Sequence, residues 1–398
     1  MAYYLLITYK GDNGKDESFD VSSLAHNIEF TTSLESQPGK LSFHLEKDPN
    51  EILKINIGSE VRFFKDSKAI FFGKVFTIET DATDVYRVVA YDNLRYLKNK
   101  DSILIDGTDS SMTLTKMFTK IMNSCGFKYE IGGWTKEVKL VPLEEHNFWN
   151  VSLFDILDYC MSEEEMRQGV SAPYQAKLAT NTSNKLYRRF YLKSNCEKIE
   201  LREIYYDFLY DENGKEKDSF LMIGDESLLN NYDYKVDIDQ DTYNRFIFVV
   251  NSEKTDSDEY ETAVIENNEI KQLVAGIDSG TVISNTNTTL DGKKIGEETI
   301  SKWGVLSTII ELKSIEPTNK LEEYMRNVVE IYSIPRKTLK LNAIGYDGVI
   351  AGSAFFLYLS KLGVHYPVYV LSATHRYDSN EHTMELEVCT NVSMRKFL

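Results

Sequence analysis

The sequence predicts an α+β protein that is mainly β, with two β-barrel or β-sandwich modules on either side of a smaller α+β middle domain. Strand-like segments are concentrated in residues 1–97 and again in residues 232–398. Helix-like segments and the longest polar stretches lie mostly between them. Because 398 residues suit two or three domains, we place the domains at residues 1–98, 99–231 and 232–398.

The first module contains strand-like segments at a density typical of barrels. In one of them Leu41, Phe43 and Leu45 alternate with polar residues, as expected of a strand that buries one face. Lys65–Lys68 is a charged hairpin tip, and Gly73 predicts a bulge or a sharp bend. The predicted strands are Tyr3–Tyr9, Ile28–Ser33, Leu41–Glu46, Val61–Phe64, Ala69–Thr80 and Val85–Tyr91.

The middle domain begins after Leu97, where the apolar period changes from two to that of a helix. A first helix starts near Ser110 or Ser111 and ends at Gly126. Its buried face carries Leu114, Met117, Phe118, Ile121, Met122 and Cys125. These caps and this spacing predict a packed helix.

A second helix begins near Asn150 or Ser152, and Asp155 is placed like the acid of a capping box. Residues 163–184 lose all periodicity and predict a long loop. A hairpin then follows, formed by Leu186–Leu192 and Ile199–Arg202.

The last module opens with strands Tyr234–Ile238 and Arg245–Val250. Residues 252–299 are acidic and rich in Asn and Thr, which predicts exposed hairpins or an extended loop. An inserted helix is expected at about residues 318–332, between two prolines. The remaining strands are Thr338–Ile344, Ala354–Leu359 and a terminal hairpin whose last strand alternates Met384, Leu386 and Val388 with polar residues.

Composition narrows the possible partners. The formal charge is −17, so the chain repels nucleic acid and anionic membranes, and we expect no sequence-specific nucleic-acid binding. The 25 tyrosines and 20 phenylalanines fit a protein that assembles with others, and they fit a large β-rich core equally well.

The cysteines and the N-terminal segment indicate a cytoplasmic protein. Cys125, Cys160, Cys196 and Cys389 are widely spaced and form no metal-ligand pattern, so we expect buried free thiols. Residues 1–9 are apolar but have no basic leader and are followed directly by Lys10, so we expect a first strand and no membrane insertion.

Patterns that could bind metals are weak. Asp237, Asp239 and Asp241 have the spacing of a calcium loop, but Thr242 replaces the glycine of that loop and Phe248 its final glutamate. These acids are better explained as the solvated face of a strand. His382-x-x-Glu385 lacks the second histidine of a zinc-protease helix and lies in a predicted strand.

Patterns that could support catalysis are weak as well. Glu144-Glu145-His146 and Glu163-Glu164-Glu165 bring carboxylates together, as glycosidases do, but adjacent residues point apart, which favours a solvated acidic patch. Gly292-Lys293-Lys294 lacks the spacing of a phosphate loop. The six histidines suggest no nucleophile triad. We therefore assign no catalytic, cofactor-binding or metal-binding residue and predict that the chain is not an enzyme.

An ordered set of short segments carries a family resemblance. The segments are Val85–Lys98, the helix beginning at Thr113, the helix start Ser152–Leu157, Lys302–Leu306, His375–Tyr377 and His382–Met384. In this order they resemble the baseplate hub protein of contractile phage tails, in the form found in Gram-positive defective prophages and phage-tail-like bacteriocins. Residues 204–230 and 252–299 are longer than the family pattern.

The resemblance implies a homotrimer whose subunit carries two tube-like modules, so that three chains present six modules. Such a hub adapts a sixfold tail tube to a threefold central spike. The implied partners are the tail tube or tube-initiator protein, the spike, the baseplate wedge proteins and the tape-measure protein. The protein would be assembled in the bacterial cytoplasm and become part of a particle released on lysis.

Two other classes remain open at the level of sequence. One is a tail-associated cell-wall hydrolase, and the other is a carbohydrate-binding β-protein. A hydrolase would turn over peptidoglycan, whereas a carbohydrate-binding protein would bind glycan without assembling.

Overall fold

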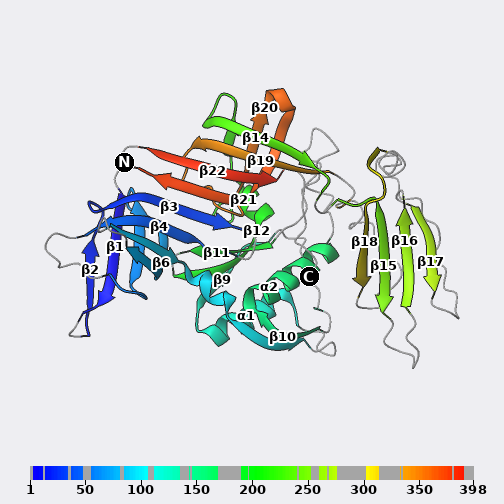
Figure 1. The fold of residues 1–398 in the computed structure, drawn as a ribbon, viewed down its shortest axis with the longest axis horizontal. Helices are drawn as coiled ribbons and strands as arrows, with labels where there is room; N and C mark the ends of the chain where they lie inside the picture. The colour runs from blue at the N-terminus through cyan, green and yellow to red at the C-terminus, as the bar shows by residue number, and fades with distance from the viewer. Residues whose placement is uncertain are drawn as a thin grey trace.

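We describe the fold from a computed structural model. It describes residues 3–11, 14–34, 37–47, 55–80, 85–105, 112–134, 143, 146–168, 190–195, 197–239, 242–251, 260–266, 269–275, 302–312, 332, 335–378 and 381–389. The α+β, mainly β class is confirmed, because most of the described residues lie in strands and short helices cover part of them (Figure 1).

One large sheet dominates the molecule and contains strands from both ends of the chain. Its strand order is β14-β19-β22-β21-β3-β4-β7-β6-β5-β1-β2; in addition β20 pairs with β21, and β13 pairs with β20. The N-terminal module is formed by β1 Tyr3–Lys10, β2 Asp16–Asp20, β3 Ala25–Ser33, β4 Lys40–Glu46, β5 Glu60–Lys65, β6 Lys68–Thr80 and β7 Val85–Tyr91. The C-terminal module is formed by β13 Met222–Gly224, β14 Leu229–Asp237, β19 Arg336–Ile344, β20 Ala354–Leu359, the 3-10 turn η2 Ser360–Leu362, β21 Val364–Tyr377 and β22 His382–Cys389.

The two modules are not separate barrels. They join edge to edge where β3 pairs with β21, so their strands form one continuous sheet (Figure 1). Each module nevertheless has its own apolar core. One core lies around Phe43 and Phe63, and the other around Leu341 and Phe355.

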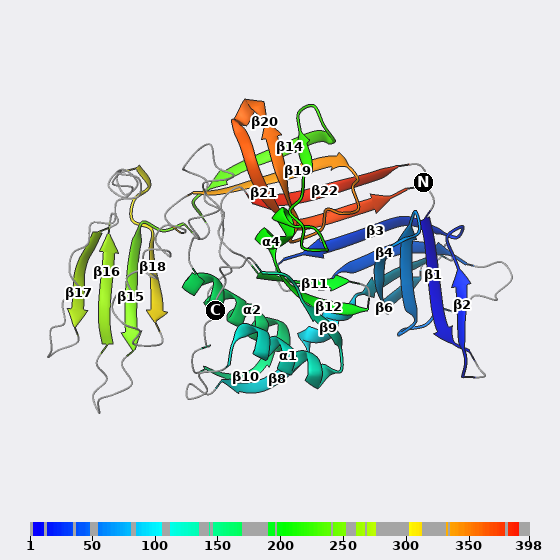
Figure 2. The same ribbon diagram turned by 180° about the vertical axis from the view of Figure 1, so that it is seen from behind.

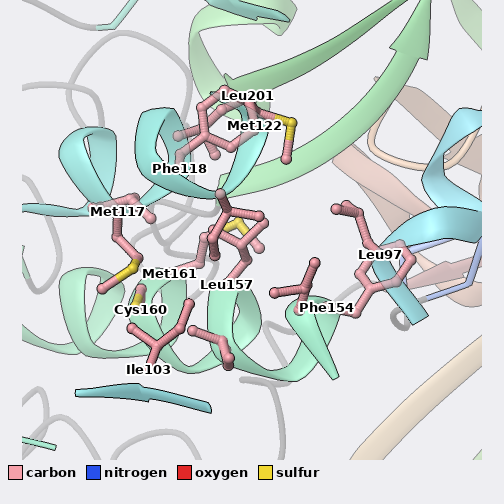
Figure 3. Packing of buried hydrophobic residues seen from close by; sticks show 14 of the residues in the cluster. Leu97, Ile103, Met117, Phe118, Met122, Phe154, Leu157, Cys160, Met161 and Leu201 are labelled. Atoms are coloured by element: carbon pink, nitrogen blue, oxygen red, sulfur yellow. The ribbon is translucent and has the colours of Figure 1, made fainter. Parts of the chain in front are cut away.

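The middle region packs two helices against short strands. Its elements are η1 Asn93–Lys98, β8 Lys100–Ile105, α1 Leu114–Cys125, β9 Lys128–Ile131, β10 His146–Ser152, α2 Leu153–Gln168, β11 Phe190–Asn195, β12 Lys198–Glu203 and α4 Ile204–Leu209. The predicted stripe on the first helix is buried except for Cys125, which is only partly buried, and Met117, Phe118 and Met122 face Leu157 and Met161 of α2 (Figure 3). From behind, β9, β11 and β12 lie between these helices and the C-terminal module (Figure 2).

A separate four-stranded sheet extends from the C-terminal module (Figure 1). It consists of β15 Arg245–Asn251, β16 Tyr260–Glu266, β17 Glu269–Ala275 and β18 Ser307–Leu312. The β16–β17 hairpin is one of the hairpins expected within residues 252–299. We call these four strands the inserted sheet, because β14 before it and β19 after it pair with each other, with Asp237 opposite Arg336.

The two modules share one strand order. In the N-terminal module the neighbours run β3-β4-β7-β6-β5, and in the C-terminal module they run β14-β19-β22-β21-β20, with every pair antiparallel. The long strands β6 and β21 each pair with the preceding strand through their first half and with the following strand through their second half. The modules differ at the next position, where β1 pairs antiparallel with β5 but β13 pairs parallel with β20.

The match extends to individual residues. Leu41 lies opposite Ala90 and Phe43 opposite Val88, whereas Leu339 lies opposite Val388 and Leu341 opposite Leu386, and all of these side chains are buried. Both long strands carry a register shift at the same place, at Phe76 in β6 and at Leu371 in β21. The repeat is therefore one of strand order, register and burial.

Several local predictions are confirmed, and others change. The turn between β5 and β6 has positive φ at Asp66 and Ser67, as a two-residue hairpin requires. Gly73 does not form a bulge. A Cβ there would lie 2.2 Å from the Tyr91 carbonyl oxygen, so glycine permits a close approach of two strands.

The first helix ends where the sequence predicts, but its start differs from the prediction. Gly126 ends α1 with φ of 70°, but the cap at its start is Thr113, which makes no side-chain capping hydrogen bond; Ser110 and Ser111 lie outside the described residues. Of the helix predicted at about 318–332, the structure describes Tyr332 alone. No helix among the described residues is long and apolar enough to cross a membrane.

Candidate functional site

The seam between the two modules is held by strand pairing and by several side-chain contacts. Along it β3 pairs antiparallel with the second half of β21, from Ser33 opposite Ser372 to Ile28 opposite Tyr377. The Thr31 and Thr374 hydroxyls lie 3.3 Å apart across this pair. Arg376 donates to Glu29 at 3.2 Å and to Glu385 at 3.3 Å, so one guanidinium joins three strands on the exposed face.

A polar cluster lies under the seam, formed by Lys65, Asp347, His375, Tyr377 and His382; we call it the seam cluster. Lys65 at the end of β5 donates to His382 Nδ1 at 2.8 Å and forms an ion pair with Asp347 at 2.9 Å. The Tyr377 hydroxyl donates to Asp347 at 3.1 Å, and the Tyr377 ring stacks on His382 at 4.3 Å. Lys65 thus connects the N-terminal module to two segments of the C-terminal module.

The hydrogen bonds of the seam cluster determine where its protons lie. Because Lys65 can only donate, His382 Nδ1 accepts, and His382 Nε2–H then donates to His375 Nδ1 at 3.0 Å. His375 Nε2–H in turn donates to the Val349 carbonyl at 2.7 Å. Both imidazoles are therefore neutral.

The surroundings favour this neutral state. Burial, the Lys65 ammonium and His375 together lower the pKa of His382 from 6.5 to about 4, although Asp347 opposes the shift. Burial also lowers the pKa of His375. The side chains of Lys65, His375 and His382 are at least 93% covered, so the cluster fastens two packed modules together.

A second polar cluster fastens the middle region to the C-terminal module. Arg202 donates to both carboxylate oxygens of Asp207, and the Tyr191 hydroxyl donates to the same carboxylate at 2.7 Å. The Tyr191 ring packs over Gly352, where φ is 87° and a Cβ would lie 2.4 Å from the ring. A side chain at residue 352 would therefore separate the two regions.

The metal-like patterns of the sequence do not form a metal site in the described part of the chain. Asp237 ends β14 and pairs with Lys235 at 2.6 Å, Asp239 lies in the bend that follows, and Asp241 lies outside the described residues. His382 is buried in the seam cluster while Glu385 contacts Arg376 at the surface, so the two side chains lie on opposite faces of β22. Those described residues contain no group of three or more possible metal ligands.

The acidic patterns have a different outcome from the one expected. Glu163-Glu164-Glu165 does not form a solvated patch, because α2 continues to Gln168 and buries Glu164 and Glu165. The Glu165 carboxylate accepts a hydrogen bond from the Phe190 amide at 2.7 Å, at the start of β11. His146 stacks on Tyr159, while Glu144, Glu145 and Gly292–Lys294 lie outside the described residues.

A shallow, open depression lies where β8 and β10 meet. Its volume is about 380 Å³, and it is lined by Lys100, Asp101, Ser102, Trp149 and Asn150. Trp149 is 79% exposed beside a bulge in β10, where Asn150 has φ of 57°. The depression therefore presents an aromatic ring to solvent without a carboxylate pair.

Sequence reasoning missed several residues that the structure uses. Lys65 and Asp347 belong to no recognisable sequence motif. They contact His382 and Tyr377, which lie in two of the segments that carry the family resemblance. Buried Asn244 accepts from the Leu306 amide and donates to the Gly304 carbonyl, both at 2.8 Å. It thereby holds the segment Lys302–Leu306.

Comparisons with known proteins agree with this fold. The sequence matches the YQBQ-like family over residues 28–273 and 284–389. No curated protein sequence matches it. Among solved structures, the 43 kDa tail protein of prophage MuSo2 from Shewanella oneidensis has a TM-score of 0.57 at 11% identity, covering 97% of this chain and 98% of that one.

Two further solved structures are similar. A tail protein from Neisseria meningitidis MC58 has a TM-score of 0.57 at 9% identity, covering 98% of this chain and 97% of that one. Prophage tail protein gp18 from Listeria monocytogenes EGD-e has a TM-score of 0.54 at 10% identity, covering 96% and 94%. At these identities the likeness concerns the fold. The chain has the fold of phage tail proteins and belongs to the YQBQ-like family.

Proposed function

We propose that the protein is a structural, non-enzymatic hub of a phage-tail baseplate, of the type found in contractile tails and phage-tail-like bacteriocins. In this role three copies form a ring that adapts a sixfold tail tube to a threefold central spike. The protein assembles in the bacterial cytoplasm and is released in a particle on lysis.

The repeated strand order of the two modules is the observation that carries this proposal. A trimer of chains with two equivalent modules presents six similar surfaces on one side and three identical chains on the other. The module seam supplies the stiffness that such a ring needs, because backbone pairing and a buried polar cluster hold the two modules together. The fold shared with prophage tail proteins supports the same role.

The proposed partners follow from the position of a hub. The tail tube or tube-initiator protein would contact the sixfold surface, the central spike the threefold surface, and the baseplate wedge proteins the outside. The tape-measure protein would end inside the channel. The domain limits 1–98, 99–231 and 232–398 remain proposals, and because β13 pairs with β20 we favour a second boundary near residue 221.

The oligomeric state of the purified protein tests the proposal. Light scattering or mass photometry should report three copies of the 45.8 kDa chain, either alone or with the spike protein. Electron microscopy of the trimer should show a ring of six similar modules. A chain that remains monomeric with and without the spike protein would reject the hub.

A carbohydrate-binding role is the second candidate, because exposed Trp149 presents its ring beside an open depression. The purified protein should bind cell-wall glycan if this role is correct, and Trp149→Ala should abolish that binding without changing the mass of the assembly. Incubation with peptidoglycan should release no product above the buffer control, and measurable release would favour a hydrolase instead.

A further inference from the structure

The outer edges of β2 and β13 and two further strand edges of the main sheet have no strand partner among the described residues. The first of these two is the outer edge of β14, which pairs on its other side with β19. The second is the last part of β6, residues 76–79, which lies beyond Lys74, where the pairing with β5 ends. On β14 the side chains of Tyr234 and Val236 are 39% and 50% exposed, so this edge displays apolar surface.

The repeat relates these two edges to the seam. The counterpart of β14 is β3, and the counterpart of β6 is β21; within the chain β3 and β21 are paired. The register shifts at Phe76 in β6 and at Leu371 in β21 align these two long strands. In this alignment Ile78 corresponds to Ala373 and Glu79 to Thr374. The partners on the neighbouring strands β4 and β19 align β3 with β14 in the same way. In that alignment Lys235 corresponds to Thr31. Val236, the next residue, then corresponds to Thr32.

We propose that β14 of one copy of the chain pairs antiparallel with residues 77–79 of β6 in a second copy, in the register that β3 and β21 show within one chain. This inference rests on the proposed function and identifies the surfaces through which the ring closes. The transferred register places Lys235 opposite Glu79 and Val236 opposite Ile78.

The side chains at these positions are complementary. Lys235 and Glu79 carry opposite charges, and at the corresponding position of the seam the Thr31 and Thr374 side chains contact each other across the strands. Val236 and Ile78 are both apolar. Ala373, the counterpart of Ile78, is fully buried, whereas Ile78 is only partly buried. Pairing with β14 would cover it in the same way.

The pairing also explains how the edges are protected. Each chain offers one β14 edge and accepts one on β6, so three copies contain three such contacts that alternate with the three seams. The ring then contains six similar junctions and leaves neither of these edges open to aggregation.

Cysteine cross-linking tests the register directly. The double variant Val236→Cys, Ile78→Cys should form dimers and trimers on a denaturing gel after treatment with a short bis-maleimide, because opposite residues on antiparallel strands are about 5 Å apart. Each single variant is the control and should remain monomeric on the gel. A cross-link that leaves the chain at monomer mass would place β14 against β6 of the same chain and overturn the proposal.

Charge reversal tests the pair Lys235 and Glu79 independently. Lys235→Glu or Glu79→Lys alone should raise the protein concentration at which half of the chains are assembled, on the order of tenfold, because like charges then face each other at three contacts. The double reversal should restore assembly. Circular dichroism on each variant checks that the chain remains folded.

The two proposals fail differently. If the wild-type protein is a trimer while the double-cysteine variant gives no cross-link and charge reversal has no effect, the strand pairing is wrong and the hub remains. If the wild-type protein does not form a trimer with or without its spike, both are wrong.

Discussion

At the scale of single residues, the seam cluster shows how buried polar groups fix one arrangement of the two modules. Its hydrogen bonds run in one direction, from Lys65 through His382 and His375 to the Val349 carbonyl. A second proton on His382 would replace the hydrogen bond from Lys65 to Nδ1, and the Asp347 carboxylate 3.5 Å from that nitrogen offsets only part of the loss. Such a network is stable when every member is satisfied and costly when one is lost.

The first prediction concerns this cluster and acid. The pKa of His382 is about 4 in the folded protein and 6.5 in the unfolded chain. Between these pH values the unfolded chain binds more protons than the folded protein. The free energy of unfolding therefore falls as the pH falls through this range. The destabilisation caused by His382→Gln should therefore be larger at pH 7 than at pH 4, by roughly 3 kcal/mol. Urea unfolding at both pH values measures it.

The control for this experiment is His365→Gln, because His365 is exposed. Its effect on the free energy of unfolding is measured at the same two pH values for comparison. An effect of His382→Gln that does not change with pH would show that the imidazole titrates normally.

A second prediction concerns Asp92, which is buried and caps η1 by accepting from the Leu94 amide at 3.0 Å. Burial raises its pKa to about 7, so the folded state binds more protons between about pH 4 and 7, and this contribution to stability decreases as the pH rises. The free energy of unfolding of Asp92→Asn, relative to that of the wild type, should therefore rise from pH 4.5 to pH 8 by roughly 3 kcal/mol.

The matched control for Asp92→Asn is Asp218→Asn, whose side chain is 89% exposed. The difference between this control and the wild type is measured at the same pH values. If Asp92→Asn behaves like the control, the Asp92 carboxylate is better solvated than its burial implies.

At the scale of elements, the sequence predicted most strands because one buried face produces a period of two. Leu41, Phe43 and Leu45 show this alternation, and so do Met384, Leu386 and Val388. Boundaries were less accurate where an element continues through polar residues. The acidic end of α2 was predicted to be solvated, yet the start of β11 covers it and Glu165 satisfies the Phe190 amide.

The third prediction compares the starts of the two long helices. In α2 the Ser152 hydroxyl accepts from the Asp155 amide at 3.1 Å and donates to its carboxylate at 2.6 Å, as in a capping box. Ser152→Ala should lower the free energy of unfolding by about 1 kcal/mol. Thr113→Ala in α1 is the matched control, since Thr113 makes no capping bond. Chemical denaturation should show a much smaller loss for the control.

At the scale of the whole molecule, the inserted sheet leaves and re-enters the C-terminal module at one point. Asp237 and Arg336 lie opposite each other at the ends of β14 and β19, so a short connection can join them. The repeat explains this position: in the N-terminal module the corresponding strands β3 and β4 are joined by residues 34–39. The large sheet should therefore not depend on the insertion for its own hydrogen bonds.

The fourth prediction follows from this position. Replacing residues 239–334 by an Asn-Gly linker should leave a soluble protein with a cooperative unfolding transition, because a two-residue turn can join paired antiparallel strands. Hydrogen exchange should show β19, β21 and β22 protected as in the full chain. Loss of protection in these strands would show that the inserted sheet is required for the C-terminal module.

The mainly β class, the two helices, several hairpins and the resemblance to phage tail proteins can all be read from the amino-acid sequence. These features depend on which side of each segment is buried and on local turn and cap chemistry, which neighbouring residues encode. The pairing of β3 with β21, and the strand order that the two modules repeat, became visible in the folded chain. An alternating pattern specifies a buried face but not the neighbouring strand, and Lys65 meets His382 across 317 positions of the chain.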